Sequence, residues 1–284
     1  MDLQLTGAHV LITGGSKGIG LACAIGFLAE GARVSLVARD PGNLKAAADR
    51  LANAAGPSGA AEASGAAEAS GTAGTNRQRI ATWPADLKDP AAAVAALDAA
   101  EASLGPVDVL VNSAGAARRY GPAELTPQTW REAMDNKYFT YIHMIDPVVK
   151  RMAARGKGAI VNVIGMGGKV ATTTHLSGGA ANAALMLASA GLARAYAVNG
   201  VRVNGVNPGL TLTDRLAEGF AAEARVGGFS VDEARSRASE KLPLGRIATP
   251  EEIANAVVFL ASPRASYITG AIVSMDGAVT PMVV

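Results

Sequence analysis

Residues 13–20, TGGSKGIG, join an apolar stretch to an amphipathic one through glycines spaced as Gly-x-x-x-Gly-x-Gly. Residues 8–12 before them have the composition of a short buried strand, and the apolar residues between Leu21 and Leu28 recur at helical spacing. A glycine turn between a strand and a helix lets the backbone approach a phosphate, and the helix N-terminus adds N–H groups for the anion. The stretch therefore predicts a phosphate-binding loop, with a glycine-rich turn that binds nothing as the alternative.

The composition indicates one domain with a substantial core. The chain has 284 residues, of which 49% are apolar and 18% charged, and no shift in composition marks a second domain. A net charge of +2 without a Lys/Arg run argues against a nucleic-acid partner. We expect no membrane partner, because the uncharged run 170–193 is too rich in Thr, Ser, Gly and Asn to span a bilayer.

The cysteine content and the N-terminus point to a cellular compartment. Cys23 is the only cysteine, which excludes an internal disulfide, and the first residues lack a basic segment leading into an apolar one. We therefore expect a cytoplasmic protein, and we expect no metal site.

Strand-like and helix-like segments alternate along the chain. Short β-branched and apolar runs predict strands, and longer amphipathic runs predict helices. Strands are expected at residues 8–12, 32–38, 79–83, 107–111, 159–164, 201–207 and 269–275, and helices at 21–30, 43–54, 91–104, 130–155, 177–198 and 250–261. This alternation predicts an α/β fold, a doubly wound parallel sheet of about seven strands with helices on both faces, in a single domain covering residues 1–284.

Two segments stand apart from this alternation. Residues 55–78 contain AAEASG at 60–65, repeated at 66–71, and such a low-complexity sequence predicts a flexible surface insertion. Residues 210–245 follow the carboxyl end of a strand, where helical insertions commonly close over a substrate, so we expect a substrate lid there.

The glycine spacing resembles that of the short-chain dehydrogenase/reductase family. The strand end Asn112-Ser113-Ala114-Gly115 resembles the Asn-Asn-Ala-Gly signature of that family, and Arg202-Val203-Asn204 followed by Pro208-Gly209 resembles another of its elements. The resemblance covers the chain apart from the insertion. It implies a Rossmann-type fold, a nicotinamide dinucleotide cofactor and oxidoreductase activity.

The resemblance also implies which residues contact the cofactor. They are Gly14, Ser16, Lys17, Gly18, Ile19, Gly20, Arg39, Asp86, Leu87, Asn112, Ala114, Gly115, Pro208, Gly209, Thr211 and Thr213. At the end of the second strand an acidic residue suits the ribose of NAD, and a basic residue suits the 2′-phosphate of NADP. Arg39 at that place, with Lys17 in the glycine loop, favours NADP(H) over NAD(H), unless both are solvated surface charges.

The residues that move the proton in this family are absent. The family uses a Ser after the fifth strand and a Tyr with a Lys four residues later, because a neighbouring cation lowers the pKa of the phenol. Alignment places Gly165, Gly178 and Asn182 at these three positions, and only the functional Asn of the family remains, as Asn136. His175 is our candidate for a substitute donor, since its ordinary pKa is near 6.5; a structural loop histidine is the alternative.

Three hypotheses about function follow. The first is an NADP(H)-dependent oxidoreductase that interconverts a carbonyl and an alcohol of a small-molecule substrate through a non-standard proton donor. The second is a redox-inactive NADP(H)-binding subunit that regulates a partner, and the third is a lyase or isomerase on the same fold. The long apolar-faced helices at 130–155 and 177–198 predict a homodimer or homotetramer.

Overall fold

The computed structural model describes residues 1–53, 77–115 and 117–282. The predicted insertion at residues 55–78 therefore lies almost entirely outside the described residues, and its flexibility stays a prediction.

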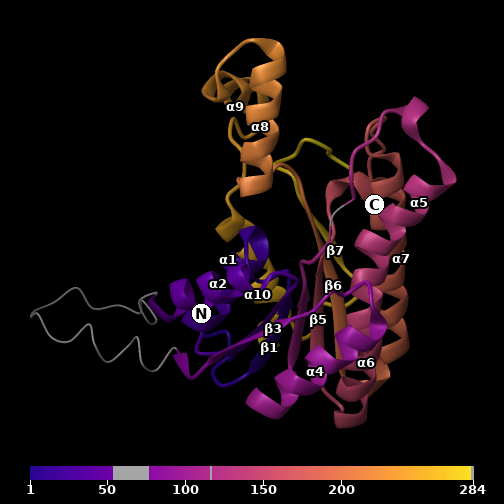
Figure 1. The fold of residues 1–284 in the computed structure, drawn as a ribbon. Helices are drawn as coiled ribbons and strands as arrows, with labels where there is room; N and C mark the ends of the chain where they lie inside the picture. Colours follow the sequence, from indigo (N-terminus) through magenta and orange to yellow (C-terminus); the bar gives the residue numbers. More distant parts are fainter. Residues whose placement is uncertain (54–76, 116, 283–284) are drawn as a thin grey trace, which may run out of the picture.

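One parallel sheet of seven strands forms the centre of the molecule, in the order β3-β2-β1-β4-β5-β6-β7 (Figure 1). The strands are β1 His9–Thr13, β2 Arg33–Ala38, β3 Ile80–Pro84, β4 Val109–Asn112, β5 Gly158–Val163, β6 Val201–Pro208 and β7 Ile272–Met275. The order reverses direction between β1 and β4, and in such sheets ligands bind beyond the carboxyl ends of the strands at that point. The predicted Rossmann-type doubly wound fold is confirmed.

Helices cover both faces of the sheet (Figure 1). They are α1 Gly18–Ala29, α2 Pro41–Asn53, α4 Pro90–Leu104, α5 Pro127–Ala133, α6 Thr140–Arg155, α7 Leu176–Tyr196, α8 Asp214–Gly227, α9 Val231–Glu240 and α10 Pro250–Ala261. Phe27, Leu44 and Val257 from α1, α2 and α10 pack on one face, and Leu97 and Leu185 from α4 and α7 pack on the other with α6. Because both faces are covered, the central strands are mostly apolar and almost fully buried.

The expected single helix at residues 130–155 is wider in its middle. Met134–Phe139 forms a π-helical segment between α5 and α6. A π segment carries one residue more per turn than an α-helix, and such segments occur often at functional sites. Here the segment contains Asn136 and Lys137, and it lies against Gly115, where an added Cβ would be 2.5 Å from the carbonyl oxygen of Asn136.

The predicted lid region forms two helices that project from the body of the domain (Figure 1, orange). Phe220 of α8, Ala234 of α9 and Ile247 form a small apolar core of their own there. The arrangement places α8 beyond the carboxyl ends of the strands. Closure of this segment over a substrate stays a prediction.

Helix α7 carries the run that we judged too polar to span a membrane. By length and composition alone, the helical stretch Leu176–Asn199 passes the criterion for a membrane span, and 39% of its apolar window is buried inside the protein. Core helices of soluble proteins pass the same criterion, so this feature carries no membrane assignment.

His9 is a fully buried polar residue in β1. Its Nδ1 lies 2.6 Å from the carbonyl oxygen of Gly105, and its Nε2 lies 2.9 Å from the hydroxyl of Ser35. A carbonyl oxygen can only accept, so Nδ1 carries the proton and Nε2 accepts from Ser35. Burial lowers the pKa of His9 below its ordinary value.

This burial predicts a pH dependence of stability. Below the ordinary histidine pKa of about 6.5, the unfolded chain binds a proton that folded His9 resists, so the free energy of unfolding should decrease as the pH falls. Above that pH, neutral His9 makes its full contribution to the free energy of unfolding. Urea unfolding between pH 5 and 8 should show a smaller dependence on pH in His9→Gln, which cannot titrate, and an unchanged dependence would contradict this role.

Candidate active site

A groove of about 840 Å³ opens beyond the carboxyl ends of the strands. The loops after β1, β2, β3, β4, β5 and β6 contribute to it, together with the start of α8. Of the residues expected to contact a cofactor, those that line the groove are Gly14, Ser16, Lys17, Gly18, Ile19, Arg39, Asp86, Leu87, Ala114, Gly115, Pro208, Gly209, Thr211 and Thr213. The structure thus brings together residues that are distant in the sequence.

Two of the expected contacts do not line the groove. Gly20 lies behind the loop, where an added Cβ would collide with the carbonyl oxygen of Gly14. Asn112 is fully buried and points along the sheet, because its Oδ1 accepts from Thr13 at 3.2 Å and its Nδ2 donates to Asn162 at 3.0 Å. Both residues shape the groove from behind rather than lining it.

The glycine loop leaves its helix N-terminus open. Gly14 has a φ of 68°, and an added Cβ would lie 2.8 Å from the backbone of Ser113 and Ala114. Lys17 is the N-cap residue of α1 and makes no capping hydrogen bond with its side chain. The first-turn N–H groups of an uncapped helix favour an anion. A phosphate group therefore fits this end of the groove.

Lys17 and Arg39 are cations of the groove that have no carboxylate partner among the described residues. Lys17 and Arg39 form no ion pair with any residue in the described parts of the chain, whereas Lys88 lies 3.8 Å from Asp86. Guanidinium and ammonium groups bind phosphate through charge-assisted hydrogen bonds. The groove thus offers a second place for an anion, at the end of β2.

The three positions that the resemblance assigns to the Ser, Tyr and Lys of the family lie close together. Gly165 lines the groove with a φ of 125°, which residues with a side chain rarely adopt. A Cβ added there would lie 3.3 Å from Nδ2 of Asn182. A serine at position 165 would therefore be strained in this backbone conformation.

His175 fills the space beside Gly178. A Cβ added to Gly178 would collide with Cε1 of His175 and would lie 2.7 Å from its Nδ1 and from Ala117. Nδ1 of His175 and Oδ1 of Asn182 are buried and lack a hydrogen-bond partner among the described residues. Burial, with the cations of Arg119 and Lys137, lowers the pKa of His175. His175 does not line the groove.

Lys137 is a groove residue that sequence reasoning missed. Its side chain is buried, and its Nζ donates to the hydroxyl of Tyr141 at 2.9 Å and to the carbonyl oxygen of Val163 at 3.1 Å. Burial, with a smaller contribution from Arg215, lowers the pKa of Lys137 to about 7. The spacing of four between Lys137 and Tyr141 on one helical segment was the available signal.

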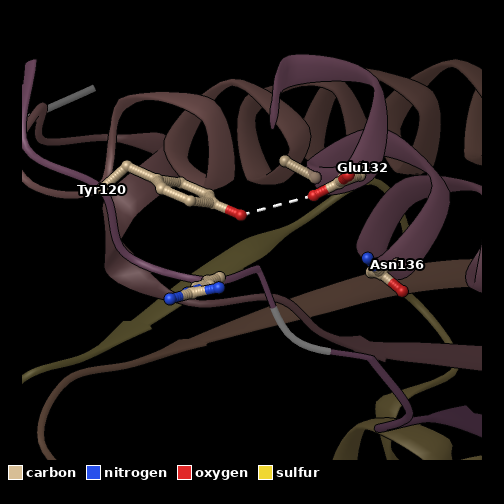
Figure 2. Close-up of a pocket in the computed structure, with 5 residues that line it drawn as sticks. Tyr120, Glu132 and Asn136 are labelled. Carbon is tan, nitrogen blue, oxygen red and sulfur yellow. Dashed lines mark hydrogen bonds between the residues drawn. The ribbon is translucent and has the colours of Figure 1, made fainter. Parts of the chain in front are cut away.

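A second cavity, of about 160 Å³, lies beside Asn136. Arg118, Tyr120, Glu132 and Ala133 form its other walls, and Figure 2 shows Tyr120 and Glu132 pointing toward one another. The hydroxyl of Tyr120 donates to Glu132 at 3.3 Å. Asn136 lines both cavities. This second cavity, called the recess below, therefore offers hydroxyl, carboxylate and amide groups next to the groove.

The contact between His175 and Gly178 can be tested by stability. Gly178→Ala should lower the free energy of unfolding by about 1–3 kcal/mol, because the new methyl group has no room. In a His175→Ala background the same change should cost at least about 0.5 kcal/mol less. Gly191→Ala on the same helix meets nothing within 4 Å and serves as the control. Equal costs in both backgrounds would show that His175 does not fill this space.

The chain is similar to known proteins in sequence and in structure. Residues 57–280 match the family model described as enoyl-(acyl carrier protein) reductase, and residues 8–63 match the one described as short chain dehydrogenase. D-threitol dehydrogenase of Mycolicibacterium smegmatis is 37% identical over 280 residues, which cover 98% of this chain and 95% of that protein.

Two solved structures are similar to the whole chain. L-sorbose reductase from Gluconobacter frateurii, complexed with NADPH and L-sorbose, has a TM-score of 0.87 and 29% identity, with both chains covered completely. An NADPH-bound short chain oxidoreductase from Pseudomonas aeruginosa PAO1, described as containing an atypical catalytic center, has a TM-score of 0.80 and 29% identity over 97% of this chain and 98% of that one. The chain belongs to the short-chain dehydrogenase/reductase family.

Proposed function

We propose that this protein is an NADP(H)-dependent oxidoreductase that interconverts a carbonyl and an alcohol on a small polyhydroxylated substrate. The observation that carries the proposal is the groove, which combines an uncapped helix N-terminus with Lys17 and Arg39, cations that have no carboxylate partner among the described residues. Both features suit an anionic dinucleotide with a further phosphate on its ribose.

The groove residues fit NADP(H) in a definite order. The N–H groups at the start of α1 would hold the pyrophosphate, and Lys17 and Arg39 would hold the 2′-phosphate. Asp86 and Leu87 would lie at the adenine, and Thr211 and Thr213 near the nicotinamide end. When bound, NADP(H) supplies the hydride chemistry of the reaction. The NADPH complexes of two similar structures support this assignment.

The substrate class follows from the recess beside Asn136. Tyr120, Glu132 and Asn136 present hydroxyl, carboxylate and amide groups that suit the hydroxyls of a polyol or a ketose. The similarity to D-threitol dehydrogenase and to L-sorbose reductase supports the same class. In this proposal Asn136 orients the substrate, and α8 and α9 close over it to exclude water.

The proton must come from a group other than the Ser, Tyr and Lys of the family pattern, since Gly165, Gly178 and Asn182 occupy those positions. His175 stays a prediction for this role, supported by its place in the space beside Gly178. The P. aeruginosa structure, which is described as containing an atypical catalytic center, supports the idea that this fold can hold a catalytic site without the usual residues.

Two further properties belong to the proposal. A cytoplasmic location fits the single thiol, which is buried. A homodimer or homotetramer fits the exposed apolar side chains Trp130, Phe139 and Leu187 on the two long helical segments.

Arg39 tests the cofactor preference. Arg39→Ala should raise the Kd for NADPH roughly tenfold, about 1.4 kcal/mol, because a charge-assisted contact with the 2′-phosphate is lost. The Kd for NADH, which lacks that phosphate, should stay the same. Arg50→Ala on α2 is the control, and fluorescence titration gives both constants. Tighter binding of NADH than of NADPH to the unchanged protein would contradict the preference.

Turnover tests the reaction class. With enzyme at a concentration comparable to the substrate, NADPH absorbance should fall in the presence of a ketose from a sugar panel, and NADP⁺ with the matching polyol should give the reverse. NADPH binding without turnover across the panel would instead support the redox-inactive subunit. Substrate conversion without net change in the cofactor would support a lyase or isomerase.

A further inference from the structure

We propose that Lys137 is the side chain that exchanges the proton with the substrate oxygen, giving it in reduction and taking it in oxidation. The proposal rests on the proposed function and deepens it, because it assigns the non-standard donor to a residue of the groove itself.

Lys137 lies in the wall of the groove, next to the residue expected to orient the substrate. It lies on the π segment directly after Asn136, and both residues line the groove together with Val163, Ile164 and Gly165. Its Nζ is anchored at the carboxyl end of β5 by the carbonyl oxygen of Val163, two residues before Gly165. The ammonium group thus lies at the carboxyl end of β5, the strand that leads to Gly165.

The groups around the Nζ of Lys137 do not compensate its positive charge. Tyr141 of α6 contributes a neutral hydroxyl and β5 a neutral carbonyl group, while Arg215 of α8 and His175 before α7 are the cationic or titratable groups that act on it electrostatically. No carboxylate pairs with Lys137 in the described parts of the chain. A buried ammonium without a counter-charge is costly, so the neutral amine becomes accessible.

Consequently Lys137 can both lose and regain a proton at neutral pH. Burial lowers its pKa to about 7, where both forms are populated and proton exchange with a substrate is efficient. Burial also raises the pKa of Tyr141, so that its phenol stays protonated and donates to Val163 while it accepts from Lys137. Tyr141 therefore acts as a positioning residue for the amine.

His175 is less suited to the role. It lines neither cavity, and its ring lies against Gly178 at the start of α7 and against Gly167 in the loop after β5. Lys137, by contrast, lines the groove next to Asn136, which also lines the recess proposed for the substrate.

The reaction transfers one hydride to the substrate carbon and one proton to the substrate oxygen. In reduction the carbonyl π bond breaks, its electron pair goes to oxygen, and the carbon gains a hydride. Bound NADPH would supply that hydride from one of its C–H bonds and become NADP⁺. An N–H bond of the Lys137 ammonium breaks and an O–H bond of the alcohol forms. Neutral Lys137 then takes a proton from water. In oxidation each bond change is reversed.

The pKa of Lys137 can be measured without cofactor or turnover. NMR of protein labelled with ¹³C at the Cε of lysine should show one resonance that titrates near pH 7 and is missing from Lys137→Arg. An unperturbed lysine titrates at about 10.4. A Lys137 resonance that titrates near that value would overturn the proposal.

Activity supplies the second readout. Lys137→Met should lower turnover by about 10²–10⁴-fold, the usual effect of losing a general acid, while the Kd for NADPH changes little. Lys137→Arg keeps the charge but has a far higher pKa, so it should be similarly slow and is the variant to use if Lys137→Met fails to fold. Lys150→Met, at an exposed site on α6 paired with Asp146, is the control.

The pH profile separates Lys137 from His175. Reduction needs the ammonium, so its rate should fall as the pH rises through about 7, and oxidation should show the opposite trend. This change in rate near pH 7 should persist in His175→Ala and be absent from the Lys137 variants. If Lys137→Met keeps its activity, or if His175→Ala alone loses it, the proposal is wrong. If the unchanged protein binds NADPH but turns nothing over, the proposed function fails along with this role, and the NMR titration still reports the pKa of Lys137.

Discussion

A buried series of side-chain hydrogen bonds joins the carboxyl ends of β1, β4 and β5. Thr13 donates to Asn112, Asn112 donates to Asn162, and Asn162 donates to Ser189 of α7 at 2.9 Å. Each of these groups is buried and would be costly to leave without a partner. The series lies where the strand order reverses, so it fixes the strand ends that form the groove.

The loops above this series pack so closely that side chains are excluded. Gly14 approaches the backbone of Ser113 and Ala114, and Gly20 approaches Gly14. Gly115 is held against the π segment in the same way, with a φ of 103°. These contacts link the phosphate end of the groove to the segment that carries Asn136 and Lys137. A change in one loop therefore affects both the cofactor end and the proton-transfer end.

Gly165, Gly178 and Asn182, which the resemblance places at the Ser, Tyr and Lys positions of the family, lie in one region of the structure. Gly178 leaves room for the ring of His175, and Gly165 adopts a backbone conformation that a serine would strain. Lys137 brings an amine to the carboxyl end of β5 from the π segment rather than from α7. The amine of Lys137 thus gives the groove a titratable group, although Gly165, Gly178 and Asn182 supply none.

Sequence reasoning succeeded where periodicity and glycine spacing determine the backbone. The loop at residues 13–20 and the alternation of strands and helices predicted the doubly wound sheet, which is confirmed. The side chain of Asn112, an expected cofactor contact, lies behind the groove, because a polar residue at a strand end can point to either side; a contact with the cofactor stays a prediction. The π segment was missed because one extra residue per turn leaves no mark in a helical pattern. Lys137 was missed because lysine is normally exposed, whereas the folded structure buries its side chain and bonds its Nζ to the carbonyl oxygen of Val163.

A crystal structure with NADP⁺ and a polyol bound would test the central claim most directly. We predict that Nζ of Lys137 lies within about 2.6–3.2 Å of the hydroxyl that faces the nicotinamide, the range required for proton transfer, with Tyr141 still holding the amine. A structure in which His175 or an ordered water makes that contact, while Lys137 bonds only to Tyr141 and Val163, would contradict it.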